Sequence, residues 1–240
     1  GGNAFLDYSY IGPEPIPPDT LAKYPLRSNP IGNYDNRVRF NIATRWRDRR
    51  INGLNYGINA NVMKSRSSTV LVWNDVDTGF YRAYPGTLTR TLGTQFYVDP
   101  FVNYHGPLGT RHSLRARYYY LNNENDNEQA NRSHFLYTEY QVQRAFDRLG
   151  GLRLTAGVSS QSTESDSQLY SGDPSGSGRN SASPRAGYVQ LDKKFFAAKL
   201  AVNAGGRYER FMVNDYEKAQ PVFRAGATYH LLEKTYVRAS

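Results

Sequence analysis

The stretch RVRFNIATRWRDRRINGLNYGINANVM, residues 37–63, reads as two extended segments joined by one tight turn. In residues 37–47 apolar and polar side chains alternate: one set of positions holds Val38, Phe40, Ile42, Thr44 and Trp46, and the other holds Arg37, Arg39, Asn41, Ala43, Arg45 and Arg47. Because successive side chains of a β-strand point to opposite faces, this segment predicts a strand with one apolar and one cationic face. Residues 54–62 repeat the alternation with asparagines on the polar side. The stretch therefore predicts an antiparallel hairpin.

The same alternation recurs along the chain in segments 114–120, 152–158, 200–207 and 223–229. Together with residues 1–11 and the last residues of the chain, these segments predict about eleven strands. Residues 54–73 are expected to run nearly twenty residues before a turn signal appears. No segment has the 3.6-residue periodicity of a convincing amphipathic helix.

The connections between these strands alternate between short and long. Tight turns are predicted at 47–53, 105–110, 147–151, 193–198 and 232–234, and polar excursions at 12–36, 74–86, 121–131, 161–183 and, shorter, 213–219. Such a chain is an up-and-down antiparallel meander whose two ends face different surroundings. Outer-membrane β-barrels have this asymmetry, with short periplasmic turns and longer external loops. An antiparallel β-sandwich also alternates and stays open as the second interpretation.

The composition narrows the class of protein. The 240 residues carry a net charge of +9 and no cysteine, which excludes a disulfide framework and thiolate metal sites. A mean hydropathy of −0.69 and the lack of an apolar run of about 18 residues exclude a helical membrane protein. Membrane strands stay compatible with these values, because their polar positions dilute the average. The 20 tyrosines suit strands and aromatic girdles, and aromatic residues also sit near the predicted short turns: Trp46, Tyr104, Phe146, Phe195 and Phe196.

An odd number of about eleven strands does not match bacterial single-chain barrels, which have even numbers. An open half-barrel would also leave unpaired strand edges in lipid. We therefore expect further strands, and read the chain as a piece of a longer protein.

Several segments resemble the barrel domain of TonB-dependent outer-membrane transporters: GGNAFLD (1–7), residues 37–63, LRARYYYLNN (114–123), YVQLDKKFF (188–196), GGRYERF (205–211) and PVFRAGATYHLLEKTYVRAS (221–240). The resemblance implies that residues 1–240 are part of an antiparallel up-and-down transmembrane β-barrel, contributing about 10–11 strands of a probable 22. The plug domain of such transporters has no counterpart among these residues.

The resemblance further implies active uptake of a scarce, bulky nutrient across the outer membrane of a Gram-negative bacterium. Ferric siderophores, haem, cobalamin and oligosaccharides all stay open as ligands. The implied partners are outer-membrane lipid, the ligand, the inner-membrane TonB motor acting through the plug, and a surface lipoprotein as an open possibility. A passive porin or an adhesin-like barrel is the alternative, and a surface β-sandwich that binds a protein or glycan is a third reading.

The candidate residues for a ligand path are arginines on the polar face of the predicted strands: Arg37, Arg39, Arg45, Arg115, Arg117, Arg207 and Arg224. In a barrel they would give the lumen a positive field that steers anionic ligands. Alternatively they pair with acids on neighbouring strands or on a plug. Nucleic-acid binding fits poorly, because the charge is spread along strands.

Trp73, Tyr81 and Tyr84 are candidates for an external aromatic platform, with an external girdle as the alternative. Residues 122–129 are rich in oxygen ligands but lack EF-hand spacing, which favours a solvated loop over a Ca²⁺ site. His105 and His112 flank one short turn and are interpreted as solvated. No arrangement of residues predicts a metal site, a cofactor or an enzyme.

Overall fold

The computed structural model describes residues 2–9, 35–70, 72, 87–126, 128–170, 178–232 and 235–240. In these ranges strands dominate, and the only helical elements are the short 3₁₀ turns η1 (Pro107–Gly109), η2 (Asp147–Leu149) and η3 (Gln168–Tyr170). No described helix has the length and apolar character needed to cross a membrane.

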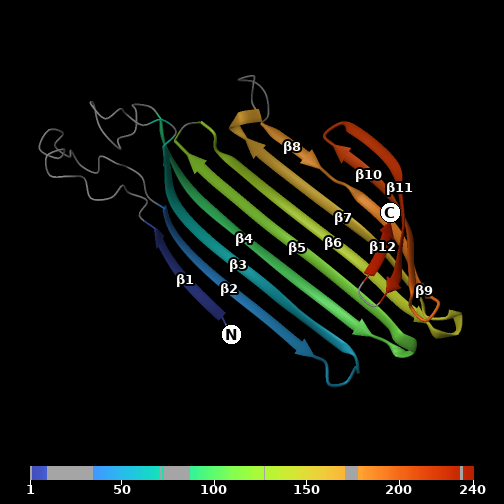
Figure 1. The fold of residues 1–240 in the computed structure, drawn as a ribbon. Coiled ribbons are helices and arrows are strands. Elements are labelled where there is room, and N and C mark those ends of the chain that lie inside the picture. Colours follow the sequence, from blue (N-terminus) through green and yellow to red (C-terminus); the bar gives the residue numbers. More distant parts are fainter. Residues whose placement is uncertain are drawn as a thin grey trace, which may run out of the picture.

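The described strands form one antiparallel sheet in which strands pair with their neighbours in the sequence, except that β8 and β9 each pair with β7 and β10 and not with each other (Figure 1). The strands are β1 (Gly2–Ser9), β2 (Asp35–Arg47), β3 (Leu54–Val70), β4 (Leu88–His105), β5 (Thr110–Asn125), β6 (Asn131–Phe146), β7 (Leu152–Ser167), β8 (Arg179–Ala182), β9 (Arg185–Phe195), β10 (Leu200–Val213), β11 (Tyr216–Leu232) and β12 (Thr235–Ala239). This is the up-and-down meander that the alternation predicted.

The short strand β8 and the longer β9 share one place in the sheet, because both pair with β7 and β10. They are separated at Ser183 and Pro184, where proline has no N–H to donate to the ladder. The backbone stays connected there, since Ser183 N donates to the Met212 carbonyl at 2.8 Å and Pro184 O accepts from Gln161 N at 2.9 Å. Twelve strands thus fill eleven positions, in agreement with the predicted count of about eleven.

The predicted tight turns are confirmed at the ends of the β2–β3, β4–β5, β6–β7 and β9–β10 pairs. Two connections at the opposite ends of the strands are shorter than predicted. Between β10 and β11 only Asn214 and Asp215 lie outside strands, so the expected excursion at 213–219 is wrong, and between β5 and β6 only 126–130 remain of the expected 121–131. Polar strand ends resemble loops in sequence, whereas the backbone continues its ladder beyond the apolar segment.

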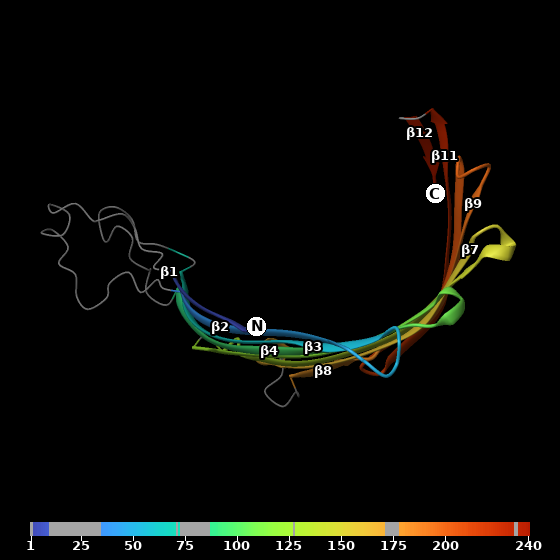
Figure 2. The ribbon, with the colours of Figure 1, turned by 90° about the horizontal axis from the view of Figure 1, so that it is seen from below.

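The sheet is a single curved layer, open between β1 and β12 (Figure 2). No second sheet covers either face among the described residues, and Ala186 is the one described apolar residue that is buried, at 8% exposure. The molecule has 17188 Å² of accessible surface, against about 10,900 Å² expected for a compact protein of its 27.2 kDa mass. This curved sheet, which we name the wall, therefore has no hydrophobic core of its own, as expected for part of a barrel and not for a sandwich.

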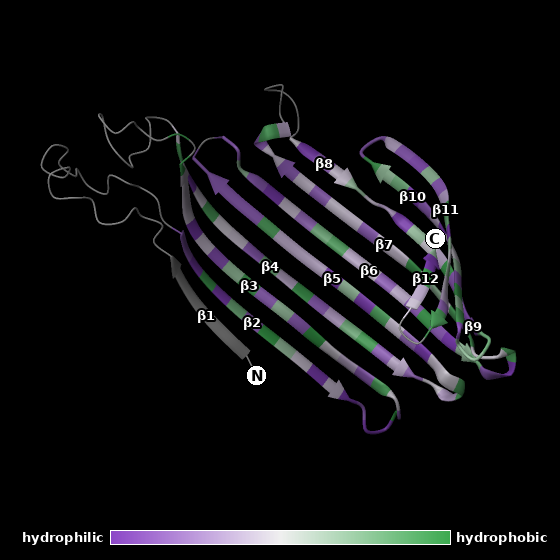
Figure 3. Ribbon diagram, viewed as in Figure 1, coloured by the Kyte–Doolittle hydropathy of each residue, from purple (hydrophilic) through white to green (hydrophobic). Residues whose placement is uncertain are grey.

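The convex face carries an apolar band, and the alternation of apolar and polar residues along each strand is visible in Figure 3. On β3 the band ends at Val62, which is followed on the same face by Lys64; on β7 it ends at Val158, which is followed by Ser160. The strand pairing places Val158 on β7 level with Tyr56 on β3, four strand spacings away. Tyr56 lies six residues before Val62, so the edge of the band shifts by six residues across these four spacings. Six residues of about 3.4 Å over four spacings of about 4.8 Å correspond to strands inclined by about 45° to the edge of the band. Transmembrane barrels have this tilt.

Aromatic side chains mark both edges of the apolar band. At the edge near the short turns Trp46 stacks on Tyr56 with ring centroids 6.0 Å apart, and the Lys193 amine lies 5.0 Å from the centre of the Phe195 ring. At the other edge Phe96 and Tyr120 lie 5.3 Å apart. Such girdles flank the apolar band of membrane barrels.

Candidate functional site

The concave face carries all seven arginines predicted to face a lumen. Arg37, Arg39 and Arg45 lie on β2, Arg115 and Arg117 on β5, Arg207 on β10 and Arg224 on β11. Each lies on the side of its strand opposite the apolar band. The alternation of the strands thus determines where these side chains lie. What they bind is a separate question that depends on their partners.

Three of these arginines form ion pairs with acids of the same sheet. Arg117 donates two hydrogen bonds to Asp99, at 2.7 and 2.6 Å. Arg207 binds Glu209, two residues along β10, at 3.0 and 3.3 Å. Arg37 pairs with Asp35 in the same way on β2. Nearby carboxylates thus neutralise these three arginines, which agrees with the alternative that the arginines pair with acids of the sheet.

Two further arginines have uncharged partners. The Arg224 guanidinium donates to the Gln190 side-chain oxygen at 2.6 Å, and the amide nitrogen of Gln190 donates to Asp192 at 3.0 Å. An Arg39 guanidinium nitrogen lies 3.2 Å from the sulfur of Met63. The first of these contacts links β11 to β9 across β10 and orients Arg224 along the wall.

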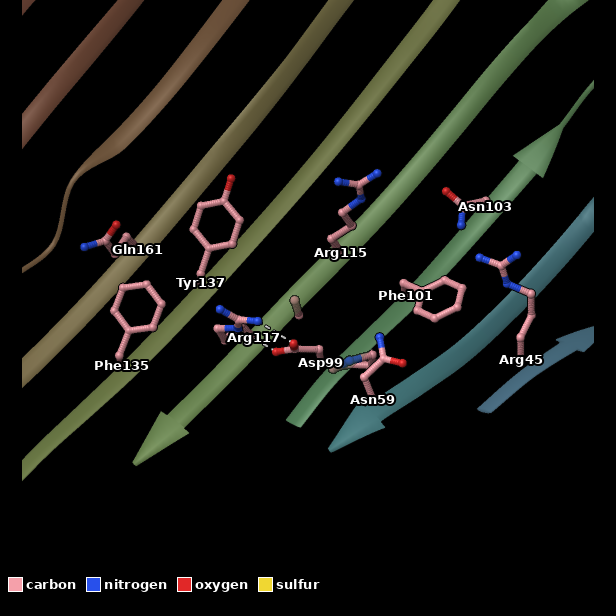
Figure 4. A pocket seen from close by; sticks show the side chains of 12 residues that line it. Arg45, Asn59, Asp99, Phe101, Asn103, Arg115, Arg117, Phe135, Tyr137 and Gln161 are labelled. Carbon is pink, nitrogen blue, oxygen red and sulfur yellow. Dashed lines mark hydrogen bonds and ion pairs between the residues drawn. The ribbon is translucent and has the colours of Figure 1, made fainter. Parts of the chain in front are cut away.

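Arg45 and Arg115 form no ion pair within the described part of the chain. They lie on either side of Phe101 in a hollow of about 620 Å³ on the concave face (Figure 4). The Arg45 guanidinium lies 5.6 Å from the centre of the Phe101 ring, within range of a cation–π contact. Apart from the Asp99–Arg117 pair and the small residues Pro100 and Ala116, the other residues that line the hollow are aromatic or carry amides: Phe135, Tyr137, Asn59, Asn103 and Gln161.

The hollow has the chemistry of a site for an anion with an unsaturated or aromatic body. The guanidinium groups of Arg45 and Arg115, which form no ion pair with a described residue, supply donors for carboxylate, phenolate or phosphate oxygens. The rings of Phe101, Phe135 and Tyr137 supply flat apolar contacts. No group of three or more His, Cys, Asp or Glu side chains placed to bind a metal ion occurs among the described residues.

Two glycines hold aromatic side chains flat against the concave face. Gly57 pairs with Phe101, and an added Cβ would lie 2.7 Å from the ring of that residue. Gly157 pairs with Tyr188, and an added Cβ would lie 2.5 Å from the hydroxyl-bearing end of that ring. Covering a strand glycine with a cross-strand aromatic ring protects the ladder there. Sequence reasoning missed these pairs because they depend on the register.

Tyr188 anchors a polar network beside the hollow. Its hydroxyl donates to Glu139 at 2.9 Å and accepts from Gln141 at 2.9 Å. Both partners lie on β6, so the ring of Tyr188 reaches from β9 across β7. The network fixes the wall next to Tyr137 and holds the carboxylate of Glu139, which is opposite Arg115 in the ladder.

Several of the other candidate residues from the sequence lie outside the part of the chain that the structure describes. Trp73, Tyr81 and Tyr84 lie outside the described residues, and so does Asn127 in the 122–129 stretch. His112, which was interpreted as solvated, also has a partner: its Nδ1 lies 2.7 Å from the Tyr140 hydroxyl and its ring stacks on that residue. Aromatic partners on neighbouring strands could not be identified before the register was known.

Comparison with solved structures shows the fold. The chain is similar to the ferric yersiniabactin uptake receptor FyuA from Yersinia pestis (12% identity, TM-score 0.66, covering 85% of this chain and 37% of that one). It is also similar to the ferripyoverdine receptor of the Pseudomonas aeruginosa outer membrane (10%, 0.61, 84% and 35%). A third similar structure is the ferric citrate transporter FecA (11%, 0.59, 86% and 35%).

These similar structures are TonB-dependent receptors of Gram-negative outer membranes, and the predicted fold, part of an up-and-down barrel, is confirmed. The chain spans little more than a third of the length of each. No protein-family model matches the sequence, and no curated protein is significantly similar to it.

Proposed function

We propose that residues 1–240 form part of the barrel domain of a TonB-dependent receptor in the outer membrane of a Gram-negative bacterium. The observation that carries this proposal is the two-faced wall. Its convex face has a tilted apolar band between aromatic rows, and its concave face is polar and holds the arginines. Water-filled or plugged barrels need this distribution, because lipid meets one face and solvent or protein meets the other.

The transported ligand in this proposal is a bulky anionic chelate. Arg45 and Arg115, which form no ion pair among the described residues, provide positive charge, and Phe101 lies between them. The similar structures include receptors for ferric yersiniabactin and ferripyoverdine and a ferric citrate transporter, which favours a ferric siderophore over haem, cobalamin or an oligosaccharide. Coupling to the TonB motor would come through a plug domain.

The test is uptake of radiolabelled ferric siderophores by cells that depend on the full-length protein. The double variant Arg45→Gln/Arg115→Gln is expected to reduce the initial uptake rate of the accepted chelate about thirtyfold, since each of the two guanidinium contacts to an anion is worth about 1 kcal/mol or more. Arg49→Gln/Arg50→Gln, in the turn after β2, removes two charges outside the hollow and should leave uptake unchanged. Equal uptake by Arg45→Gln/Arg115→Gln and the wild type would contradict a ligand path along this hollow.

A second arm separates active transport from a passive pore. Collapsing the proton-motive force with a protonophore should abolish uptake if the protein is coupled to an inner-membrane motor. Uptake that continues unchanged, in proportion to the external concentration, would contradict the receptor and favour the passive porin.

A further inference from the structure

Two arginines face each other on the membrane-facing side of the wall, at the external edge of the apolar band. Arg185 on β9 and Arg210 on β10 are direct partners in the antiparallel ladder. Both lie on the convex side. Arg185 shares its face of β9 with Val189, four residues away, and Arg210 shares its face of β10 with Tyr208, two residues away. Directly opposed residues have Cβ atoms about 5 Å apart, and like charges in this position repel each other.

The neighbouring carboxylates compensate only one of the two charges. Glu217 on β11 accepts hydrogen bonds from Arg210 at 2.6 and 2.7 Å. Arg185 is exposed and forms no ion pair with a described residue, and its partner on the other side, on β7, is the uncharged Ser160. An anion that bridges Arg185 and Arg210 would remove the repulsion and satisfy the free guanidinium.

An open notch lies directly below this pair. Gly187 follows Arg185 on the same face of β9, and a Cβ added there would meet no atom within 4 Å. Its partners on the two sides, Val158 on β7 and Tyr208 on β10, are each 59% exposed. The missing side chain leaves open space between the aliphatic Val158 and the aromatic Tyr208, and we name this open strip the groove.

A cationic pair above an apolar groove at the membrane edge matches the shape of one molecule of lipid. We propose that Arg185 and Arg210 bind the phosphate of a phosphorylated glycolipid in the outer leaflet, and that one of its acyl chains lies over Gly187 between Val158 and Tyr208. The orientation rests on the proposed function, which places the long loops outside the cell. The lipid site itself requires neither the transported ligand nor the motor.

The test uses the full-length protein in detergent, incubated with bisphosphorylated lipid A and measured by native mass spectrometry. We expect the wild type to retain one lipid, and Arg185→Gln to retain it about tenfold less, because one charge-assisted contact is lost. Gly187→Leu, which fills the groove and keeps both charges, should also reduce retention. Lipid A without its phosphates should bind no better to the wild type than to Arg185→Gln.

Lys193→Gln is the matched control, since Lys193 lies on the same face of β9 at the opposite edge of the band. It should retain lipid as the wild type does, and all variants should show the far-UV circular dichroism of a folded barrel. Equal retention by Arg185→Gln and the wild type would overturn the proposal, and so would an equal loss in Lys193→Gln. Lost lipid retention with normal chelate uptake supports the lipid site independently of transport, whereas normal retention in a protein that transports no chelate would contradict only the proposed function.

Discussion

At the scale of single residues, Gly157 and Gly187 are both strand glycines with different surroundings. A Cβ at Gly157 would lie 2.5 Å from the Tyr188 ring and 2.8 Å from the Tyr140 backbone oxygen, whereas a Cβ at Gly187 would meet nothing within 4 Å. Gly157→Ala therefore forces Tyr188 away from Glu139 and Gln141. We expect it to lower the free energy of unfolding by about 2 kcal/mol, from overpacking and lost hydrogen bonds.

Urea titration of the protein in lipid vesicles measures this difference through the midpoint of unfolding. Gly187→Ala is the control and should change the free energy of unfolding by less than about 0.5 kcal/mol. Equal effects of the two alanines would show that the Tyr188 ring does not lie over Gly157.

The Arg210–Glu217 pair lies beyond the apolar band and responds to pH. The hydrogen bonds from Arg210 lower the pKa of the Glu217 carboxyl below its ordinary value of 4.5. A lowered pKa in the folded state stabilises the protein above the unfolded-state pKa, and this contribution is lost as the pH falls through the folded-state pKa. The wild type should thus be slightly more stable than Glu217→Gln at pH 7.

The two proteins should converge in urea midpoint as the pH falls below about 4. The difference at pH 7 is expected to be small because both side chains are exposed. A difference that grows on acidification would contradict the pairing.

At the scale of elements, the turn between β9 and β10 has an unfavourable backbone. Phe196, Ala197 and Ala198 have φ values of 53°, 52° and 70°. Residues with a Cβ disfavour this left-handed region by about 1–2 kcal/mol each, and glycine does not. Ala198→Gly should therefore raise the free energy of unfolding by about 0.5–1 kcal/mol, after the larger entropy of glycine in the unfolded chain is subtracted.

Ala201→Gly, three residues later and inside β10, is the comparison and should lower stability by a similar amount. Both are measured from urea midpoints in the same vesicles. Destabilisation by Ala198→Gly would show that the left-handed turn is not populated.

Sequence patterns predicted the elements well where one face is apolar. The strands around Val38–Trp46 and Leu54–Val62 alternate clearly, and four of the predicted tight turns between strands are confirmed. Strand ends beyond the band could not be predicted, because both faces are polar there, as in Tyr216–Ala219. The pairs Gly57–Phe101 and Arg185–Arg210 join residues on different strands, so they become visible only once the register is known.

At the scale of the whole molecule, the seven predicted arginines differ in whether they form an ion pair. Their place on the concave face followed from the alternation alone. Whether each forms an ion pair depends on its side-chain contacts: Arg117 meets Asp99 on β4, whereas Arg115, two residues before it, forms no ion pair among the described residues, although Glu139 is its partner in the ladder. The sequence therefore predicted a set of candidates, and the contacts reduced it to the two arginines in the hollow that form no ion pair, Arg45 and Arg115.

The central claim is that the wall stands between lipid and a polar lumen, and site-directed spin labelling tests it most directly. Residues 1–240 contain no cysteine, so single cysteines can be placed at successive positions 56–63 of β3 in the full-length protein, once any cysteine outside residues 1–240 has been replaced by serine. In lipid vesicles, labels at even positions should collide with dissolved oxygen and those at odd positions with a water-soluble nickel reagent, with a period of two. Equal access of the nickel reagent to both faces, or a protein that stays in solution without lipid, would contradict the account.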